Sequence, residues 1–383
     1  METSYIEISE SAIQNNIQFI QELIGSNVTF SSVVKGNAYG HGIETYCPLA
    51  YKYGVKHFSV SDVNEAYQVK NILPYKDITI MIMGMIDSKQ LAWVIENNIE
   101  FYVFEIDRLE EAVKIAKAIK IPAKIHIEIE TGMNRTGFKT KELQQIIRFV
   151  KINKEHLLIK GFCSHLAGAE SISNYKRVAD QKKKFKSIQN KIKTDDFFNP
   201  AFHLASSAAT IRYPKTRLDM VRIGILQFGF FPTKEILVHY LNKQNALESP
   251  LKRIISWKTK VMDIKIIKTG QFIGYGTSYL TNHETKIAII PVGYSSGYSR
   301  SLSNRGRVLI NGIRHDIIGT INMNMMVVDV TQNEQVKKGD EVVLIGNQEE
   351  QEITISSFND AIQLVNYELL TRLPNNIPRI ITK

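Results

Sequence analysis

Apolar and polar positions along the first part of the chain follow two alternating patterns. An apolar face that repeats every three or four residues predicts an amphipathic helix over 9–25, with Ser9 as N-cap and Gly25 as its stop. Short apolar runs predict eight strands, at 28–34, 57–61, 78–84, 101–105, 124–130, 158–165, 201–206 and 219–223. Helical patterns separate these strands, at 62–72, 88–97, 107–119, 140–152 and 174–190.

Near-continuous apolar strands that alternate with helices are typical of a parallel sheet buried on both faces. Eight such units favour the α/β class, in the form of a closed (β/α)8 TIM-like barrel, over an open doubly wound sheet. A dinucleotide-binding fold is disfavoured because no Gly-x-Gly-x-x-Gly follows the first strand.

The pattern changes at about residue 251. Strand-like segments separated by turn residues predict a mainly β, largely antiparallel C-terminal domain, with one helical segment near 356–366. The segments are 254–264, 286–292, 307–310, 325–330 and 341–345, with turns at Asn311-Gly312 and 338–340. We therefore expect a barrel domain at 1–232, a linker with a short helix at 233–250, and a β domain at 251–383.

Composition narrows the function. The net charge of the 383 residues is +10, but the lysines are scattered, and the one dense run, 182–184 with Lys186, is a solvated helix face, so we expect no nucleic-acid partner. The first residues have no signal-peptide pattern, and the longest apolar run, 78–86, is too short to span a bilayer. We expect a cytoplasmic protein with no membrane partner. Cys47 and Cys163 have neither metal-ligand spacing nor a disulfide pattern, so no metal is expected.

Lys35 directly follows the first predicted barrel strand. A lysine in such a place usually extends its ammonium to solvent. A partly desolvated strand-end lysine instead has a lowered pKa and can attack a carbonyl carbon, as Schiff-base lysines do. The glycines, tyrosine and histidine that follow, in the run Val33-Val34-Lys35-Gly36-Asn37-Ala38-Tyr39-Gly40-His41-Gly42, favour this second interpretation.

Other polar residues, like Lys35, stand at or just after the ends of predicted barrel strands. In a (β/α)8 barrel, functional groups gather at the C-terminal ends of the strands, and phosphate is often bound after strands seven and eight. Five candidates lie at or just after predicted strand ends: Lys35, Arg135, His165, Ser207 and Arg222. The Ser207 hydroxyl and the Gly224 and Ile225 amides would suit a phosphate.

The run around Lys35 closely resembles the pyridoxal-phosphate (PLP) lysine motif of bacterial alanine racemases, and the resemblance covers essentially the whole chain. Gly36 stands where that family more often has alanine. The resemblance implies that Lys35 binds the cofactor as an aldimine and serves as one catalytic base. Tyr39 would contact the cofactor phosphate, and His165 would lie against the pyridine ring. Arg222 would face the pyridine nitrogen; because arginine does not give up its proton, that nitrogen would stay unprotonated.

Further motifs of the family lie in the predicted β domain. The segment Gly274-Tyr275-Gly276-Thr277-Ser278-Tyr279 resembles the one that bears the tyrosine base, with Tyr275 in that place. Tyr294 matches an active-site tyrosine, and the Met323 amide together with Arg135 would bind the substrate carboxylate. Tyr367 would lie at the phosphate and the substrate entrance. In the family the tyrosine base comes from the partner subunit, which implies a head-to-tail homodimer with shared active sites.

The resemblance implies a PLP-dependent isomerase that interconverts L- and D-alanine by a two-base mechanism and supplies D-alanine for peptidoglycan. A racemase of other or broader specificity, for serine or basic amino acids, stays open. A PLP barrel decarboxylase and a single-domain PLP-binding barrel are disfavoured, the first because the chain has no Gly-Gly pair and the second because of the β domain.

Three positions depart from the family pattern. Glu128 stands where many members have a carbamylated lysine, and its charge could instead orient Arg135. Ser206 replaces an asparagine, and Asn324 replaces an aspartate. Because two of the three lie near the expected substrate side, they leave the choice of amino acid open.

Overall fold

The computed structural model describes residues 3–194, 199–355 and 366–383. The chain forms two compact units. The barrel unit comprises Ala12–Ala38 and Tyr46–Lys252, and the β unit comprises Met1–Ser11, Tyr39–Thr45 and Arg253–Lys383. Among the helices described, none is long and apolar enough to cross a membrane.

The barrel unit contains the predicted closed barrel of eight parallel strands. The strands, in order around it, are β2 (Thr29–Val33), β3 (His57–Val60), β4 (Thr79–Ile82), β5 (Glu100–Val103), β6 (Ala123–Glu128), β7 (Leu157–Cys163), β8 (Ala201–Ser206) and β9 (Met220–Ile223). β9 pairs with β2, with Ser31 beside Arg222, and closes the circle. Met81, Tyr102, Cys163 and Met220 form part of the apolar packing.

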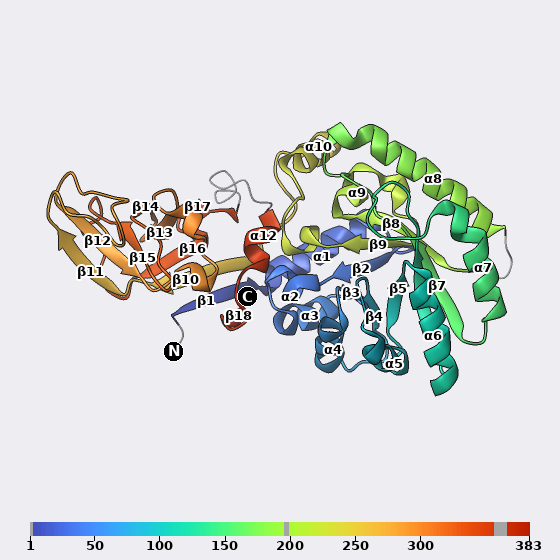
Figure 1. The fold of residues 1–383 in the computed structure, drawn as a ribbon. Coiled ribbons are helices and arrows are strands. Elements are labelled where there is room, and N and C mark those ends of the chain that lie inside the picture. Colours follow the sequence, from blue (N-terminus) through green and yellow to red (C-terminus); the bar gives the residue numbers. More distant parts are fainter. Residues whose placement is uncertain (1–2, 195–198, 356–365) are drawn as a thin grey trace. The chain divides into compact units, whose positions relative to one another are not determined.

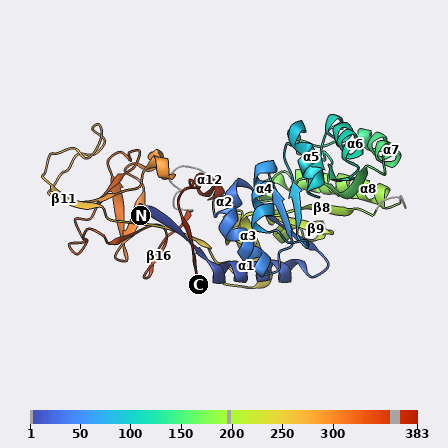
Figure 2. The same cartoon turned by 90° about the horizontal axis from the view of Figure 1, so that it is seen from below.

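Helices enclose the strands, as two views show (Figure 1; Figure 2). They are α1 (Glu10–Ile24), α3 (Ile43–Lys52), α4 (Val63–Ile72), α5 (Ser88–Glu96), α6 (Ile106–Ile119), α7 (Leu143–Ile152), α8 (Tyr175–Lys193), α9 (Ser207–Arg212) and α10 (Lys234–Gln244). The apolar face predicted for the first helix, which includes Ile13, Ile17 and Ile20, is the face that α1 buries. Asp62 caps α4 by accepting a hydrogen bond from the Glu65 N–H. α10 is the short helix expected within 233–250, and it belongs to the barrel unit.

The β unit is built on one large, mainly antiparallel sheet in the order β11-β12-β15-β14-β13-β16-β10-β1-β18, with β17 paired to β16. Its strands are β1 (Ser4–Ser9), β10 (Ile255–Lys260), β11 (Asp263–Ile267), β12 (Thr285–Ile290), β13 (Arg307–Ile310), β14 (Ile313–Ile318), β15 (Met326–Asp329), β16 (Glu341–Gln348), β17 (Gln351–Ile353) and β18 (Arg379–Thr382). Asn311 and Gly312, both at positive φ, form the tight turn between β13 and β14.

The structure corrects the expected domain boundary. Residues 1–11 do not belong to the barrel, because β1 pairs with β10 and β18 of the large sheet. The single strand expected over 254–264 is two strands, β10 and β11, and the sequence pattern missed β14, β17 and β18. The helix expected near 356–366 falls almost wholly outside the described residues, and α12 (Asn366–Thr371) begins at its end.

Candidate active site

The C-terminal ends of the barrel strands bring the predicted residues of the barrel unit to one rim. Lys35 follows β2, His165 follows β7, Ser207 follows β8, and Arg222 lies in β9. Strand pairing sets Ser206 beside Arg222. Because all eight strands are parallel, these side chains share one end of the barrel, as the sequence predicts.

The backbone after Lys35 forms an unusual turn, which covers the segment α2 (Lys35–Tyr39). Gly36, Asn37, Ala38 and Tyr39 all have positive φ, between 52° and 65°. Such a conformation is costly for residues other than glycine, and a run of them persists only where surrounding contacts hold it. It is typical of a functional segment.

Glu65 of α4 holds this turn, and sequence reasoning missed it. Its carboxylate accepts hydrogen bonds from the N–H of Gly36 at 2.6 Å and of Asn37 at 3.3 Å. Its second oxygen accepts from the Ser61 N–H at 2.8 Å. One side chain therefore ties the turn after Lys35 to the end of β3.

The environment of Lys35 makes its ammonium easier to deprotonate. The side chain reaches solvent at the rim, but desolvation by the surrounding loops and the positive charge of Arg135 lower its pKa. The negative charge of Glu65 acts in the opposite direction and does not cancel them. A neutral amine is the form that reacts with a carbonyl group.

Arg222 is buried and firmly oriented. Its Nη1 lies 2.6 Å from Nδ1 of His203 and donates to the His203 carbonyl at 3.0 Å, and its Nη2 donates to the Ser164 carbonyl at 2.7 Å. These are the three acceptors that the described residues give it. An arginine has five N–H donors, so two remain for a ligand.

Gln227, which the sequence pattern did not single out, joins two strand ends on this rim. Its Nε2 donates to the carbonyls of Val33, at 2.9 Å, and Ile223, at 3.0 Å. Its Oε1 accepts from the hydroxyls of Ser32 and Tyr46. The ends of β2 and β9 are therefore fixed to each other next to Lys35.

The candidate phosphate residues lie together. The Ser207 hydroxyl accepts a hydrogen bond from the Gly224 N–H at 3.0 Å, and Ile225 begins a short 3-10 helix, Ile225–Phe228. Ser207 is buried, whereas the Ser206 side chain, one of the departures from the family pattern, forms no cap on α9.

His165 lies among positive charges. Burial, followed by the charges of Arg222, Arg135 and Lys35, lowers its pKa to about 3. Its imidazole is therefore neutral at ordinary pH.

The predicted contact between Glu128 and Arg135 is not formed. Within the described ranges, no ion pair joins the two residues; Glu128 is buried at the end of β6, whereas Arg135 is exposed on the loop that follows. The loop itself is shaped by Glu130, whose carboxylate accepts hydrogen bonds from the N–H groups of Gly132 and Asn134.

In the β unit, two loops bring Tyr294 and Met323 together. The Tyr294 N–H donates to the Asn322 carbonyl, and the Ser295 N–H donates to the Met323 carbonyl. The loops approach so closely at Gly293 that a Cβ there would lie 2.1 Å from the Asn322 oxygen, which only glycine avoids. Both Tyr294 and Met323 are exposed.

Tyr275 and Asn324 lie in the same group of loops. The Tyr275 carbonyl accepts from the Thr320 hydroxyl at 3.4 Å, and the Tyr275 side chain is 73% exposed. Asn324, another departure from the family pattern, donates to the Ser295 hydroxyl at 2.9 Å. It therefore acts within the Met323 loop.

Tyr39 and Tyr367 form a second pair in the β unit. Their ring centroids lie 5.9 Å apart, edge to face, and burial raises the pKa of Tyr39. Arg379 donates to the Gly40 carbonyl at 2.9 Å, which fixes the segment after Tyr39 to β18.

The chain combines a (β/α)8 barrel, with Lys35 on its C-terminal rim, and a mainly antiparallel β unit, and this combination defines its class of fold. Residues 8–232 match the family model described as alanine racemase, N-terminal domain, and residues 254–381 match that described as alanine racemase, C-terminal domain. The chain belongs to the alanine racemase family and is an amino-acid racemase.

Individual relatives agree with this assignment. The alanine racemase of Leptospira interrogans (strain Fiocruz L1-130) is 33% identical over 379 residues, which cover 99% of this chain and 96% of that one. The structure of alanine racemase from Bacillus anthracis with bound L-Ala-P has a TM-score of 0.90 at 29% identity, covering 100% of this chain and 96% of that one. The structure from Bartonella henselae with covalently bound pyridoxal phosphate has a TM-score of 0.85 at 27% identity and covers both chains fully.

Proposed function

We propose that this protein is a PLP-dependent alanine racemase in which Lys35 and Tyr275 are the two bases. The observation that carries the proposal is Lys35 itself. Its amine, with a lowered pKa, lies on the barrel rim that also carries Ser207 and Arg222. A relative of this chain contains covalently bound pyridoxal phosphate.

The donors on the rim fit the cofactor. The Lys35 amine would hold its aldehyde carbon. The Ser207 hydroxyl and the Gly224 and Ile225 N–H groups would bind its phosphate, with the Gly224 N–H exchanging its Ser207 acceptor for a phosphate oxygen. Tyr39 and Tyr367 would add their hydroxyls. Arg222 is a donor only, and its orientation is already fixed by three carbonyl and imidazole acceptors. It would face the pyridine nitrogen and hold it unprotonated, with neutral His165 against the ring.

When bound, PLP withdraws electrons from the substrate and so makes the Cα proton acidic. The chain's own residues would then move protons. Tyr275 would take the Cα proton of L-alanine on one face, and Lys35 would return a proton to the opposite face. In the D-to-L direction the two roles exchange. Arg135 and the Met323 N–H would bind the carboxylate, with Tyr294 beside it, so that only the two faces of Cα are open to the bases.

We infer that the active form is a head-to-tail homodimer, in which Tyr275 of one copy serves Lys35 of the other. The high exposure of Tyr275 in the β unit supports this arrangement. In the cell, the racemase would supply D-alanine for peptidoglycan. Location in the cytoplasm stays a prediction.

Borohydride reduction of the PLP-loaded protein tests the cofactor assignment. We expect PLP to be fixed to the peptide that contains Lys35, and label on a different lysine would contradict it. A panel of L-amino acids then tests the substrate. Alanine should be turned over fastest, whereas faster turnover of serine or a basic amino acid would favour the broader racemase that the sequence leaves open.

A further inference from the structure

Four buried polar side chains form a continuous line across the barrel interior. Glu100 of β5 lies 2.7 Å from His126 of β6, between Oε2 and Nε2. Nδ1 of His126 lies 2.9 Å from Nε2 of His203 on β8, and Nδ1 of His203 lies 2.6 Å from Nη1 of Arg222. All four are buried, and Arg222, at 6%, is the most exposed of them.

Arg222 determines the position of every proton in this line. Its guanidinium can only donate, so Nδ1 of His203 must accept and carries no proton. A neutral His203 therefore has its proton on Nε2 and donates to Nδ1 of His126. His126 in turn has its proton on Nε2 and donates to Glu100. The two imidazoles are locked in one tautomer each, between a fixed cation and a carboxylate.

The electrostatics of the line agree with this assignment. Burial lowers the pKa of both His126 and His203, so both imidazoles are neutral. Burial raises the pKa of Glu100, but the hydrogen bond from His126 and the nearby imidazole of His57, 3.8 Å away, outweigh it and lower that pKa overall. Lys160 adds a cation 3.7 Å from Oε1 of Glu100. Glu100 is therefore a carboxylate that accepts a hydrogen bond from Nε2 of His126.

The fold makes room for the contact at the centre of the line. A Cβ on Gly161 of β7 would lie 2.5 Å from Nδ1 of His126 and 3.0 Å from Nε2 of His203. Any side chain at residue 161 would have to displace the two rings from each other. Glycine is thus required where the two imidazoles meet.

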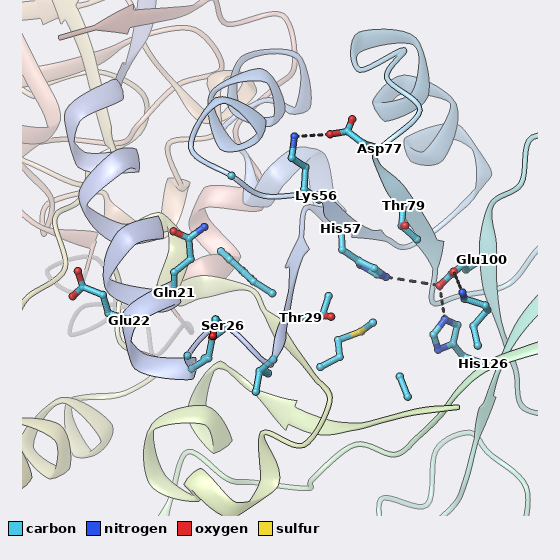
Figure 3. Close-up of a pocket in the computed structure, with 18 of the residues that line it drawn as sticks. Gln21, Glu22, Ser26, Thr29, Lys56, His57, Asp77, Thr79, Glu100 and His126 are labelled. Atoms are coloured by element: carbon cyan, nitrogen blue, oxygen red, sulfur yellow. Dashed lines mark hydrogen bonds and ion pairs between the residues drawn. The ribbon is translucent and has the colours of Figure 1, made fainter. Parts of the chain in front are cut away.

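Glu100 lies at the end of the barrel opposite to Lys35. It is the first residue of β5, and it lines a cavity of about 950 Å³ together with the first residues of β2, β3, β4, β8 and β9. Figure 3 shows Glu100 and His126 facing each other at this cavity, with His57 directed at the same carboxylate from β3. The line therefore joins the N-terminal mouth of the barrel to the rim that carries the candidate active site.

We propose that Glu100 is a positioning residue for Arg222 and acts through His126 and His203. This inference rests on the proposed function, in which Arg222 faces the pyridine nitrogen. Without an acceptor at residue 100, His126 is free to move its proton to Nδ1, where it opposes the Nε2 proton of His203. His203 must then carry its own proton on Nδ1. That proton faces Nη1 of Arg222, which is also a donor, so the hydrogen bond between the two residues is lost. One carboxylate thus decides whether Arg222 keeps its acceptor.

The experiment compares Glu100→Leu, Glu100→Gln and Gly161→Ala with the unaltered protein. Asp77→Asn is the matched control, because Asp77 lines the same cavity but pairs with Lys56 outside the line. The first readout is the ¹⁵N NMR spectrum of the histidine rings in protein without PLP. We expect His126 and His203 to carry their protons on Nε2 in the unaltered protein, in Asp77→Asn and in Glu100→Gln, whose amide oxygen still accepts. Glu100→Leu and Gly161→Ala should lose this pattern.

The second readout is the absorption spectrum and racemisation rate of the PLP-loaded variants. Glu100→Leu should shift the cofactor band and lower kcat about tenfold or more, the size expected for one lost hydrogen bond to a charged group, with little change in KM. Glu100→Gln should recover most of this loss.

If Glu100→Leu does not fold, a doubly protonated or Nδ1-protonated His203 in the unaltered protein overturns the inference by itself. Unchanged tautomers or an unchanged cofactor band in Glu100→Leu would also overturn it. Absence of racemisation in the unaltered protein would contradict the proposed function instead.

Discussion

The carboxylate of Glu65 lies 2.6 Å from the N–H of Gly36 and so closes the left-handed turn that follows Lys35. This contact links α4 to the residue on which the proposed chemistry depends. A hydrogen bond to a charged acceptor contributes about 1.5–3 kcal/mol, enough to offset much of the cost of positive φ at Asn37 and Ala38. Lys35 is therefore placed by a side chain thirty residues further along the chain.

Glu65→Ala should release this turn. We expect faster hydrogen exchange at the Gly36 and Asn37 amides and weaker retention of PLP, because both amides lose their acceptor. Asp62→Ala is the control, since it removes the cap of α4 and leaves the Gly36 contact in place. It should cost about 1 kcal/mol of stability without faster exchange at Gly36. Equal exchange at Gly36 in the two variants would show that the turn is held by other contacts.

Tyr275→Phe should retain PLP and the dimer but lose most of the racemase activity. Loss of a general base typically lowers the rate by about 10²–10⁴-fold. Tyr279→Phe, in the same loop, is the matched control and should leave the rate near that of the unaltered protein. Racemisation at a near-normal rate by Tyr275→Phe would reject the second base.

Stability should depend on pH through the buried histidines. The pKa of His165 is lowered from 6.5 to about 3 in the folded protein, and burial also lowers the pKa of His126 and His203. Below about pH 6.5 the unfolded chain therefore binds more protons than the folded chain, and the free energy of unfolding falls. Each such histidine lowers the free energy of unfolding by up to about 1.4 kcal/mol for each pH unit of acidification.

Urea unfolding of the protein without PLP, at several pH values between 7.5 and 5, measures how steeply the free energy of unfolding falls with pH. We expect His165→Asn to make the fall with pH shallower by the contribution of one proton. A slope that is the same in His165→Asn as in the unaltered protein would mean that His165 is already protonated in the fold.

The barrel strands could be predicted from the sequence because most of their residues are buried and each reads as a short, largely apolar run between helical patterns. The sequence could not predict that β1 belongs to the large sheet of the β unit, because its partners β10 and β18 lie at the other end of the chain. Strand pairing over such distances leaves no local pattern. The run over 254–264 contains neither glycine nor proline, so no such turn residue marked the break between β10 and β11.

Some residues of the candidate site could be predicted from the sequence and others could not. Lys35, Ser207 and Arg222 could be identified because each stands at a strand end, where barrel proteins place functional groups. Glu65, Gln227 and His203 could not, since each acts by a hydrogen bond that exists only once distant strands are closed into a barrel. The expected pairing of Glu128 with Arg135 rested on sequence position alone, and no ion pair joins these two residues in the described ranges, where Glu128 is buried and Arg135 is exposed.

Racemisation of L-alanine in D₂O tests the central claim most directly. The PLP-loaded protein should form D-alanine that carries deuterium at Cα, because the proton returned to the opposite face comes from a base that exchanges with solvent. Lys35→Ala should form none. Formation of D-alanine with deuterium by the unaltered protein alone is the result we predict. No D-alanine from the unaltered protein, or an equal yield from Lys35→Ala, would contradict the account.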